Sequence, residues 1–274
     1  MNPYGAAFVM FLYQVAVGGL VGLSATPFND LERGFYKSTA GVLVIAAVLA
    51  LWGQIDLLPE RSGVRDVLGV LLLAVFTLFL ILYFVSLWGE RGFLRARFFS
   101  TAILTGLGGL IVASYAFSGP SLGPVEAVFL PLSFVVSALL LGAVTVGMLI
   151  GHWYLIETGQ SLEPFFRVFR FFVAMLVIQT GLEMFGTALL YLFGTAATEA
   201  TVERLFSHHL VLLSSRFLVA QAAPLALSWM IWKTLTDFNN TMAATGLFYI
   251  ALLGVFVGEL LSSHILVLAG GAAQ

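Results

Sequence analysis

Eight long apolar runs decide what this chain can fold into. Each is about as long as the 20 residues that an α-helix needs to cross a hydrocarbon core of about 30 Å, or longer. The runs lie at 4–24, 38–58, 66–88, 98–118, 126–151, 168–194, 207–232 and 243–268. Because a bilayer leaves no water to satisfy backbone polar groups, each run is expected to form a helix. The sequence therefore predicts an all-α fold, a polytopic transmembrane helix bundle of about eight spans.

The charge content excludes the water-soluble alternatives. Only 9% of the 274 residues are charged and 60% are hydrophobic, whereas a soluble domain carries about 25% charged residues. The net charge of −2 leaves no basic surface for phosphates, so no nucleic-acid partner is expected. Cysteine is absent, which removes disulfides, thiolate metal sites and cysteine nucleophiles. The connections between runs are short, so we expect one integral membrane domain over 1–274.

The distribution of lysine and arginine predicts an orientation. The connections that follow runs one, three, five and seven hold eight basic residues, whereas the other three connections hold three. Basic loops are typical of the cytoplasmic side. Both termini are then expected outside, which is the periplasm for a bacterial inner membrane. The first run follows no positive charge and is long, so we expect it to remain as a span and not to be a cleaved signal.

Three ionisable residues lie inside the predicted spans, where such groups are rare and usually functional. Glu183 is eleven residues from the outer end of its run, and Arg216 and Glu259 are each nine residues from theirs. At the rise of an α-helix these are depths of roughly 14–16 Å. We therefore expect the three side chains to meet at one level and interpret them as a catalytic or proton-carrying site.

The charge count of this group is uneven. Arg216 can neutralise one carboxylate, so the second carboxyl group is expected to hold a proton. Gln179 lies one helical turn from Glu183, Gln14 lies at a similar depth in the first run, and His209 precedes Arg216 by seven residues. We interpret these three as quinone-binding or proton-path residues that lead outward. The alternative is an ion pair that only fixes how the last three spans pack.

Histidine offers one further possibility. His208 or His209 could meet His264 near the outer face and hold a single haem, although a solvated pair at a helix start is the favoured interpretation of His208 and His209. His152 lies at the opposite end of its run and cannot join them. No metal site is predicted.

Three short segments carry a resemblance to known proteins. They are Gly151–His152–Trp153–Tyr154–Leu155, Ala244–Thr245–Gly246–Leu247–Phe248–Tyr249–Ile250–Ala251 and Gly258–Glu259–Leu260. These segments resemble bacterial eight-span membrane proteins to which no chemistry is assigned. In architecture, the eight spans, outward termini and outer polar cluster are similar to the quinol-interacting membrane subunits of the NrfD and polysulfide-reductase type. That resemblance implies a subunit without haem that passes electrons from quinol to iron–sulfur and molybdenum subunits outside the membrane.

Two classes of function fit these features. The first is a membrane subunit of a bacterial respiratory assembly, in contact with lipids and with cytochrome or iron–sulfur partners. In it, Glu183 or Glu259 would accept a quinol proton and Arg216 would orient a carboxylate or a quinone carbonyl. The second is a proton-coupled transporter with the same cluster as its substrate site. In a third interpretation, the chain is a structural or assembly subunit and the charges only lock the packing.

Overall fold

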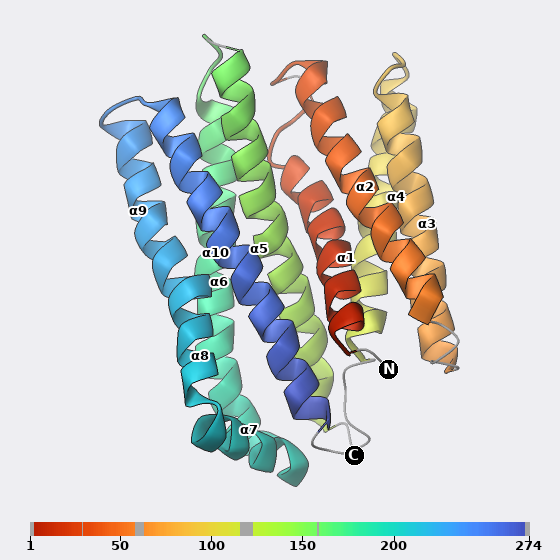
Figure 1. Ribbon diagram of the computed structural model, residues 1–274. Coiled ribbons are helices and arrows are strands. Elements are labelled where there is room, and N and C mark those ends of the chain that lie inside the picture. The colour runs from red at the N-terminus through yellow and green to blue at the C-terminus, as the bar shows by residue number, and fades with distance from the viewer. Residues whose placement is uncertain (1–2, 29, 58–62, 116–122, 158, 272–274) are drawn as a thin grey trace.

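The structure, a computed structural model, describes residues 3–28, 30–57, 63–115, 123–157 and 159–271. These residues form helices and connections, without a strand (Figure 1). The helices are α1 (Pro3–Leu23), α2 (Arg33–Leu57), α3 (Val64–Ser86), α4 (Gly92–Ser114), α5 (Pro124–Ile156), α6 (Glu163–Phe193), α7 (Ala196–His208), α8 (Leu210–Phe217), η3 (Leu218–Ala222), α9 (Ala223–Thr236) and α10 (Thr241–Gly271).

The eight predicted spans are confirmed as long apolar helices. Within the described residues, eight helical segments are long and apolar enough to cross a membrane, the seventh being Leu210–Thr236, which joins α8, η3 and α9. Large apolar side chains such as Ile45, Leu104 and Val128 are exposed on the outside of the bundle. These faces suit contact with lipid, since exposed apolar area of this extent is unusual for a protein in water.

Several helix boundaries differ from the expected ones. We expected spans from 98 and from 168, but α4 begins at Gly92 and α6 at Glu163. Arg95, Arg97 and Arg167 were expected in connections and instead lie in the opening turns of these helices. The physical reason is that an apolar run marks the hydrocarbon thickness, whereas a helix continues into the interface, where long basic side chains reach water.

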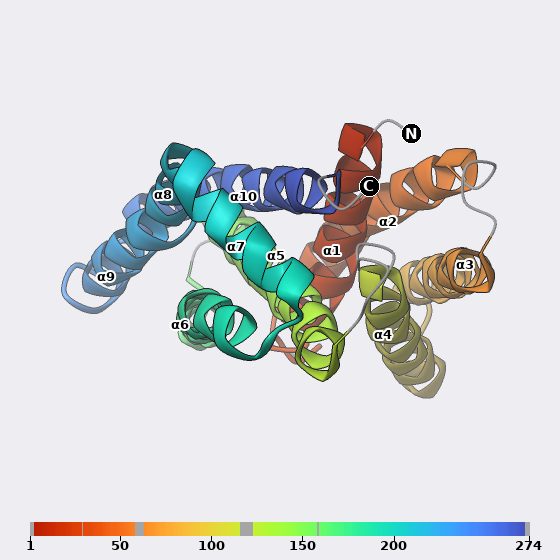
Figure 2. The same cartoon turned by 90° about the horizontal axis from the view of Figure 1, so that it is seen from below.

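The expected connection between the sixth and seventh spans is wrong in one respect, because it contains the helix α7. Thr195 caps this helix by accepting a hydrogen bond from the Thr198 amide at 3.4 Å. None of the residues of α7 is buried, and Figure 2 shows the helix running across one end of the bundle. A short helix with apolar residues on one face only contains no long apolar run, so its sequence does not have the pattern of a membrane span.

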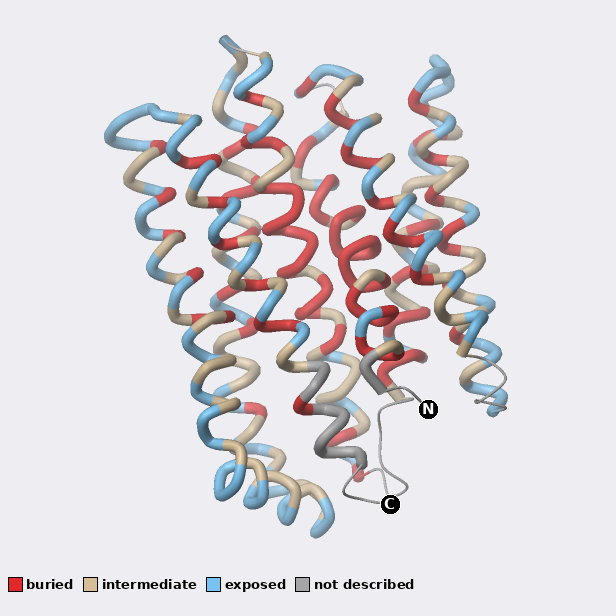
Figure 3. The backbone as a smooth tube through the Cα atoms, viewed as in Figure 1, coloured by how far each residue is buried: buried red, intermediate tan, exposed pale blue. Residues whose placement is uncertain are grey.

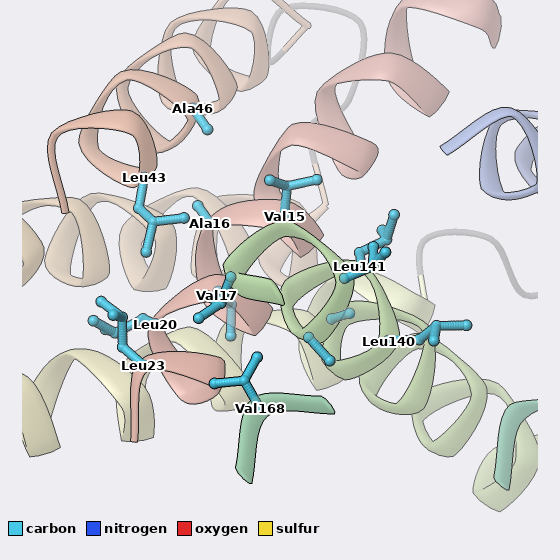
Figure 4. Packing of buried hydrophobic residues seen from close by; sticks show 14 of the residues in the cluster. Val15, Ala16, Val17, Leu20, Leu23, Leu43, Ala46, Leu140, Leu141 and Val168 are labelled. Carbon is cyan, nitrogen blue, oxygen red and sulfur yellow. The ribbon is translucent and has the colours of Figure 1, made fainter. Parts of the chain in front are cut away.

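The most enclosed helix is α1, which lies between α2 and α5 (Figures 1 and 3). Its side chains Val15, Ala16, Val17 and Leu20 are buried against Leu141 and the rest of the apolar core (Figure 4). Contact with α5 is at the backbone level: a Cβ atom added at Gly18 would lie 1.6 Å from the Ala138 carbonyl oxygen. Small residues at this contact therefore set the separation of α1 and α5.

Figure 1 shows that α1 begins, α10 ends and α7 lies at the same end of the bundle, which we call the termini end. The opposite end, the loop end, holds the starts of α2, α4, α6 and α10. At the side of α9, α10 packs closely on η3: a Cβ atom added at Gly258 would lie 2.1 Å from the Cβ of Ala220. This close approach places Glu259, the next residue of α10, beside the seventh span.

Candidate functional site

An ion pair joins α6 to α8. Arg216 donates from Nη1 to Glu183 Oε2 at 3.0 Å and from Nη2 to Glu183 Oε1 at 2.5 Å. Both side chains are 16% exposed. A bidentate guanidinium–carboxylate pair is a strong and directional form of charge-assisted hydrogen bonding. The sequence prediction that these two side chains share a depth agrees with this contact.

Two buried amides complete what we call the carboxylate cluster, namely Glu183, Arg216, Gln179 and Gln221. Gln179 and Gln221 donate from Nε2 to Glu183 Oε1 at 2.8 and 2.9 Å. Thr180 in turn donates to Gln221 Oε1 at 2.9 Å and so fixes the orientation of that amide. With the two Arg216 contacts, Glu183 accepts four N–H hydrogen bonds.

Sequence reasoning missed Gln221 and Thr180. Gln221 is fully buried and lies in the π-helical turn η3, five residues after Arg216. On a regular α-helix, residues five apart point in different directions, so Gln221 was not expected to join Arg216 at one site. The wider π-turn changes this spacing, and such turns are frequent at functional sites. Pro224 follows at once and disrupts the α-helical hydrogen bonding of this region.

Glu259 lies close to the cluster without pairing with it. It is a buried residue of α10, and the Ser137 side chain of α5 lies near its carboxyl group. Arg216 and Glu183 are near enough to interact with it electrostatically, but Glu259 forms no ion pair within the described part of the chain. The three spans thus bring one cation together with two carboxyl groups, of which one is fully paired.

A cleft of about 750 Å³ opens between α6, α7 and α8. Glu183 and Arg216 stand on its wall, and apolar and aromatic side chains, among them Met184, Phe206 and Phe217, provide most of its lining. An apolar space of this size with a few convergent polar groups is typical of small-molecule sites. Glu259 is not among the lining residues.

A buried carboxylate holds α7 over this cleft. Glu126, at the start of α5, accepts hydrogen bonds at Oε1 from the Thr195 amide and the Thr198 hydroxyl, both at 2.7 Å. Glu126 is only 7% exposed. Sequence reasoning missed this role, because Glu126 stands at the first position of its apolar run and its partners follow almost 70 residues later.

We expect Glu126→Leu to loosen α7 without unfolding the bundle. The change removes two hydrogen bonds to a charged acceptor, each worth about 1.5–3 kcal/mol. Amide hydrogen exchange in α7 should therefore rise by at least about tenfold, since 1.4 kcal/mol is one decade. Glu199→Leu, an identical change at an exposed position of α7, is the control. Equal exchange rates in the two variants would contradict the anchoring role.

The remaining candidates lie apart from the cluster. Gln14 is buried in α1 and donates to the Phe134 carbonyl of α5 at 3.3 Å. His209 occupies the corner between α7 and α8, where its backbone N–H donates to the Leu205 carbonyl at 2.9 Å, and its side chain forms no hydrogen bond with a described residue. His208 is exposed. The side chain of His264 lies outside the described residues. The structure therefore brings Gln179, but neither Gln14 nor His209, into contact with Glu183.

Among the described residues, no group of three or more His, Asp or Glu side chains is arranged to hold a metal ion. His152 lies at the loop end, where its Nδ1 is 3.2 Å from the hydroxyl of Tyr249. Both residues belong to segments that carry the sequence resemblance.

No protein-family model matches the chain, and no curated protein sequence matches it either. The class of protein follows from the fold alone. Eight long apolar helices with lipid-facing outer surfaces define an integral membrane protein.

Proposed function

We propose that this protein is a membrane subunit of a bacterial respiratory assembly and binds quinol or quinone in the cleft between α6, α7 and α8. The observation that carries the proposal is the ion pair of Glu183 and Arg216 on the wall of an apolar cleft of about 750 Å³. A quinone combines an apolar tail with two ring oxygens, which need an apolar cleft and a few polar partners. The architectural similarity to quinol-interacting subunits of the NrfD and polysulfide-reductase type supports it.

The hydrogen bonds assign different tasks to the two sides of the ion pair. Glu183 Oε1 accepts three N–H groups, whereas Oε2 accepts one, from Arg216. A carboxylate oxygen accepts two donors readily, so Oε2 can receive a quinol hydroxyl. The Arg216 guanidinium can also interact with a ring carbonyl oxygen of the quinone. This oxygen gains electron density when quinone is reduced, so the positive charge would stabilise it. The two residues would thus bind and orient the ring.

Glu259 extends the site into the protein. Oxidation of a quinol releases two electrons and two protons, and each proton needs an acceptor. A proton taken by Glu183 would leave Arg216 without its counter-charge, and Glu259 could restore neutrality by ionising. Glu183 would accept the first quinol proton while Glu259 releases its own, and transfer of the proton from Glu183 to Glu259 would then reset the pair. Glu183 could accept the second quinol proton in the same way, so both protons leave through one cation shared by two carboxyl groups.

In this proposal the two electrons pass from the quinol to a partner protein. From the distribution of basic residues we infer that the termini end faces outward, which is the periplasm if the protein lies in a bacterial inner membrane. The cleft is beside α7 at this end. A cytochrome or iron–sulfur subunit that accepts the electrons would then dock at the periplasmic side.

Photo-crosslinking with an azido-quinone tests the binding site. We expect labelled peptides from α6, α7 and α8, and we expect Met184→Trp to lower the labelling by about tenfold, because the larger side chain narrows the cleft at its wall. Phe185→Trp is the matched control, since Phe185 is 73% exposed and does not line the cleft. Labelling that is spread over other helices, or equal in the two variants, would reject the quinone site.

We expect Glu259→Gln to leave quinone labelling within about twofold of the wild type and to lower quinol-linked electron transfer in host membranes by about a hundredfold. The amide keeps the size of the side chain but cannot carry the proton, and removal of a general base typically costs 10²–10⁴ in rate, roughly. Glu199→Gln, on the exposed face of α7, is the control. Electron transfer at the wild-type rate in both variants would remove Glu259 from the mechanism.

One observation favours a proton-coupled transporter as the second candidate. The span Leu210–Thr236 is interrupted by the π-turn η3 beside the carboxylate cluster, and interrupted helices line the substrate sites of many transporters. Two results together would support this candidate over the first. The protein would not be labelled by azido-quinone, and addition of a substrate would change the pH inside proteoliposomes that contain the protein.

A further inference from the structure

Arg95 is a buried cation at the loop end, far along the chain from the carboxylate cluster. It lies in the first turns of α4 and is 9% exposed. Its guanidinium stacks on the Phe28 ring, 3.8 Å from the centroid, and Nη2 donates to the Gly89 carbonyl at 2.9 Å. The Nε donor is buried and has no partner. The side chain is therefore held in place with part of its hydrogen-bonding capacity unused.

No carboxylate in the described structure balances this charge. Arg33, which carries a like charge, and Tyr83 interact electrostatically with Arg95. Asp30, from the connection before α2, is paired with Arg167 instead. A buried charge without a counter-ion is costly. The guanidinium of Arg33 adds to that cost through like-charge repulsion. A bound anion would lower the cost of both charges.

The helix termini at this end of the bundle add positive potential to that of the Arg95 side chain. Both α2 and α4 begin at this end, and neither has an acidic residue in its first turn. Helix N-termini present free N–H groups and a positive dipole, which favour anions such as phosphate. The aromatic side chains of Trp88, in the connection before α4, and of Phe93, in the first turn of α4, are largely exposed. Exposed aromatic rings of this kind are typical of the interface between hydrocarbon and head groups.

We propose that Arg95 and Arg33 bind the phosphate group of an anionic phospholipid at the loop end. The buried guanidinium supplies the fixed donor, and Arg33, exposed at the start of α2, closes over the phosphate from the water side. The exposed aromatic side chains beside the site favour a lipid over free phosphate, because they would contact the glycerol and upper acyl chains. This site is independent of the proposed quinol cleft, which lies at the other end of the bundle.

Native mass spectrometry of the full-length protein in mild detergent tests the site. With added phosphatidylglycerol or phosphatidylethanolamine, we expect retention of the anionic lipid to exceed that of the zwitterionic lipid by at least about fivefold. Arg95→Gln should lower phosphatidylglycerol retention by at least about threefold. Arg170→Gln is the matched control, because it removes the same charge at the loop end from an arginine already paired with Glu163 at 2.8 Å.

Each other outcome overturns the proposal. An equal loss of lipid in Arg95→Gln and Arg170→Gln would show a diffuse attraction to positive charge without a site. Displacement of the lipid by millimolar inorganic phosphate would show a site for soluble phosphate. If Arg95→Gln does not fold, Arg33→Gln decides, because Arg33 is exposed and its loss should spare the fold. Retention in that variant equal to the wild type would reject the lipid site.

Discussion

Gly142→Ala is expected to leave little folded protein, whereas Gly108→Ala is expected to behave as the wild type. A Cβ atom at Gly142 would lie 1.8 Å from the carbonyl carbon of Gly18, and α1 and α5 meet there backbone to backbone. Neither backbone can rotate away, so the two helices must separate. Overpacking costs about 1–3 kcal/mol even where side chains adjust, and here the central helix pair loses its contacts as well.

The control variant, Gly108→Ala, is not expected to lose stability. A Cβ atom at Gly108 meets nothing within 4 Å, and alanine is about 1 kcal/mol better than glycine inside a helix. Fluorescence-detected size-exclusion chromatography after heating would compare the melting temperatures of the two variants in detergent. Gly18→Ala provides a second test of the same contact from the other helix. If Gly142→Ala and Gly18→Ala have the same melting temperature as the wild type, the close approach of α1 and α5 is wrong.

The eight spans were predictable because the bilayer imposes one rule on every segment. A segment that crosses hydrocarbon must be apolar over its whole thickness and helical. Helix ends obey no such rule, so α5 extends over Pro124–Ile156 although its apolar run is shorter. The helix α7 escaped prediction for the same reason. It lies across the end of the bundle and has to be apolar on one side only.

The site was predictable where depth alone decides the contact. Glu183 and Arg216 pair across neighbouring helices, and Gln179 is one turn from Glu183 on the same helix. Gln221 depends on the local π-turn, which the spacing of polar residues does not reveal. Glu126 meets Thr195 only through the packing of α5 on α6. Contacts that depend on a local helix defect or on long-range packing need the structure.

Arg216→Gln is expected to destabilise the protein by about 1–3 kcal/mol, because it removes one partner from a partly buried ion pair and leaves the carboxylate unpaired. Glu183→Gln is expected to cost less, because Glu259 can ionise and supply the charge that balances Arg216. Without Arg216, by contrast, no cation remains near either carboxyl group in the described structure. The two variants are expected to lose different amounts of stability because one cation interacts with two carboxyl groups. If one cation interacted with a single carboxylate, the two variants would lose similar amounts.

Thermal unfolding of the two single variants and of Glu183→Gln/Arg216→Gln completes a double-mutant cycle. We expect the double variant to be more stable than Arg216→Gln alone, since both charges leave together. Glu163 and Arg170 offer a comparison at an exposed pair, where a coupling of about 0–1 kcal/mol is expected. If the double variant regains stability but not azido-quinone labelling, the pair acts in ligand binding beyond its part in packing. If it regains both, the charges only fix the packing of α6 against α8, and the quinone proposal loses its central residues.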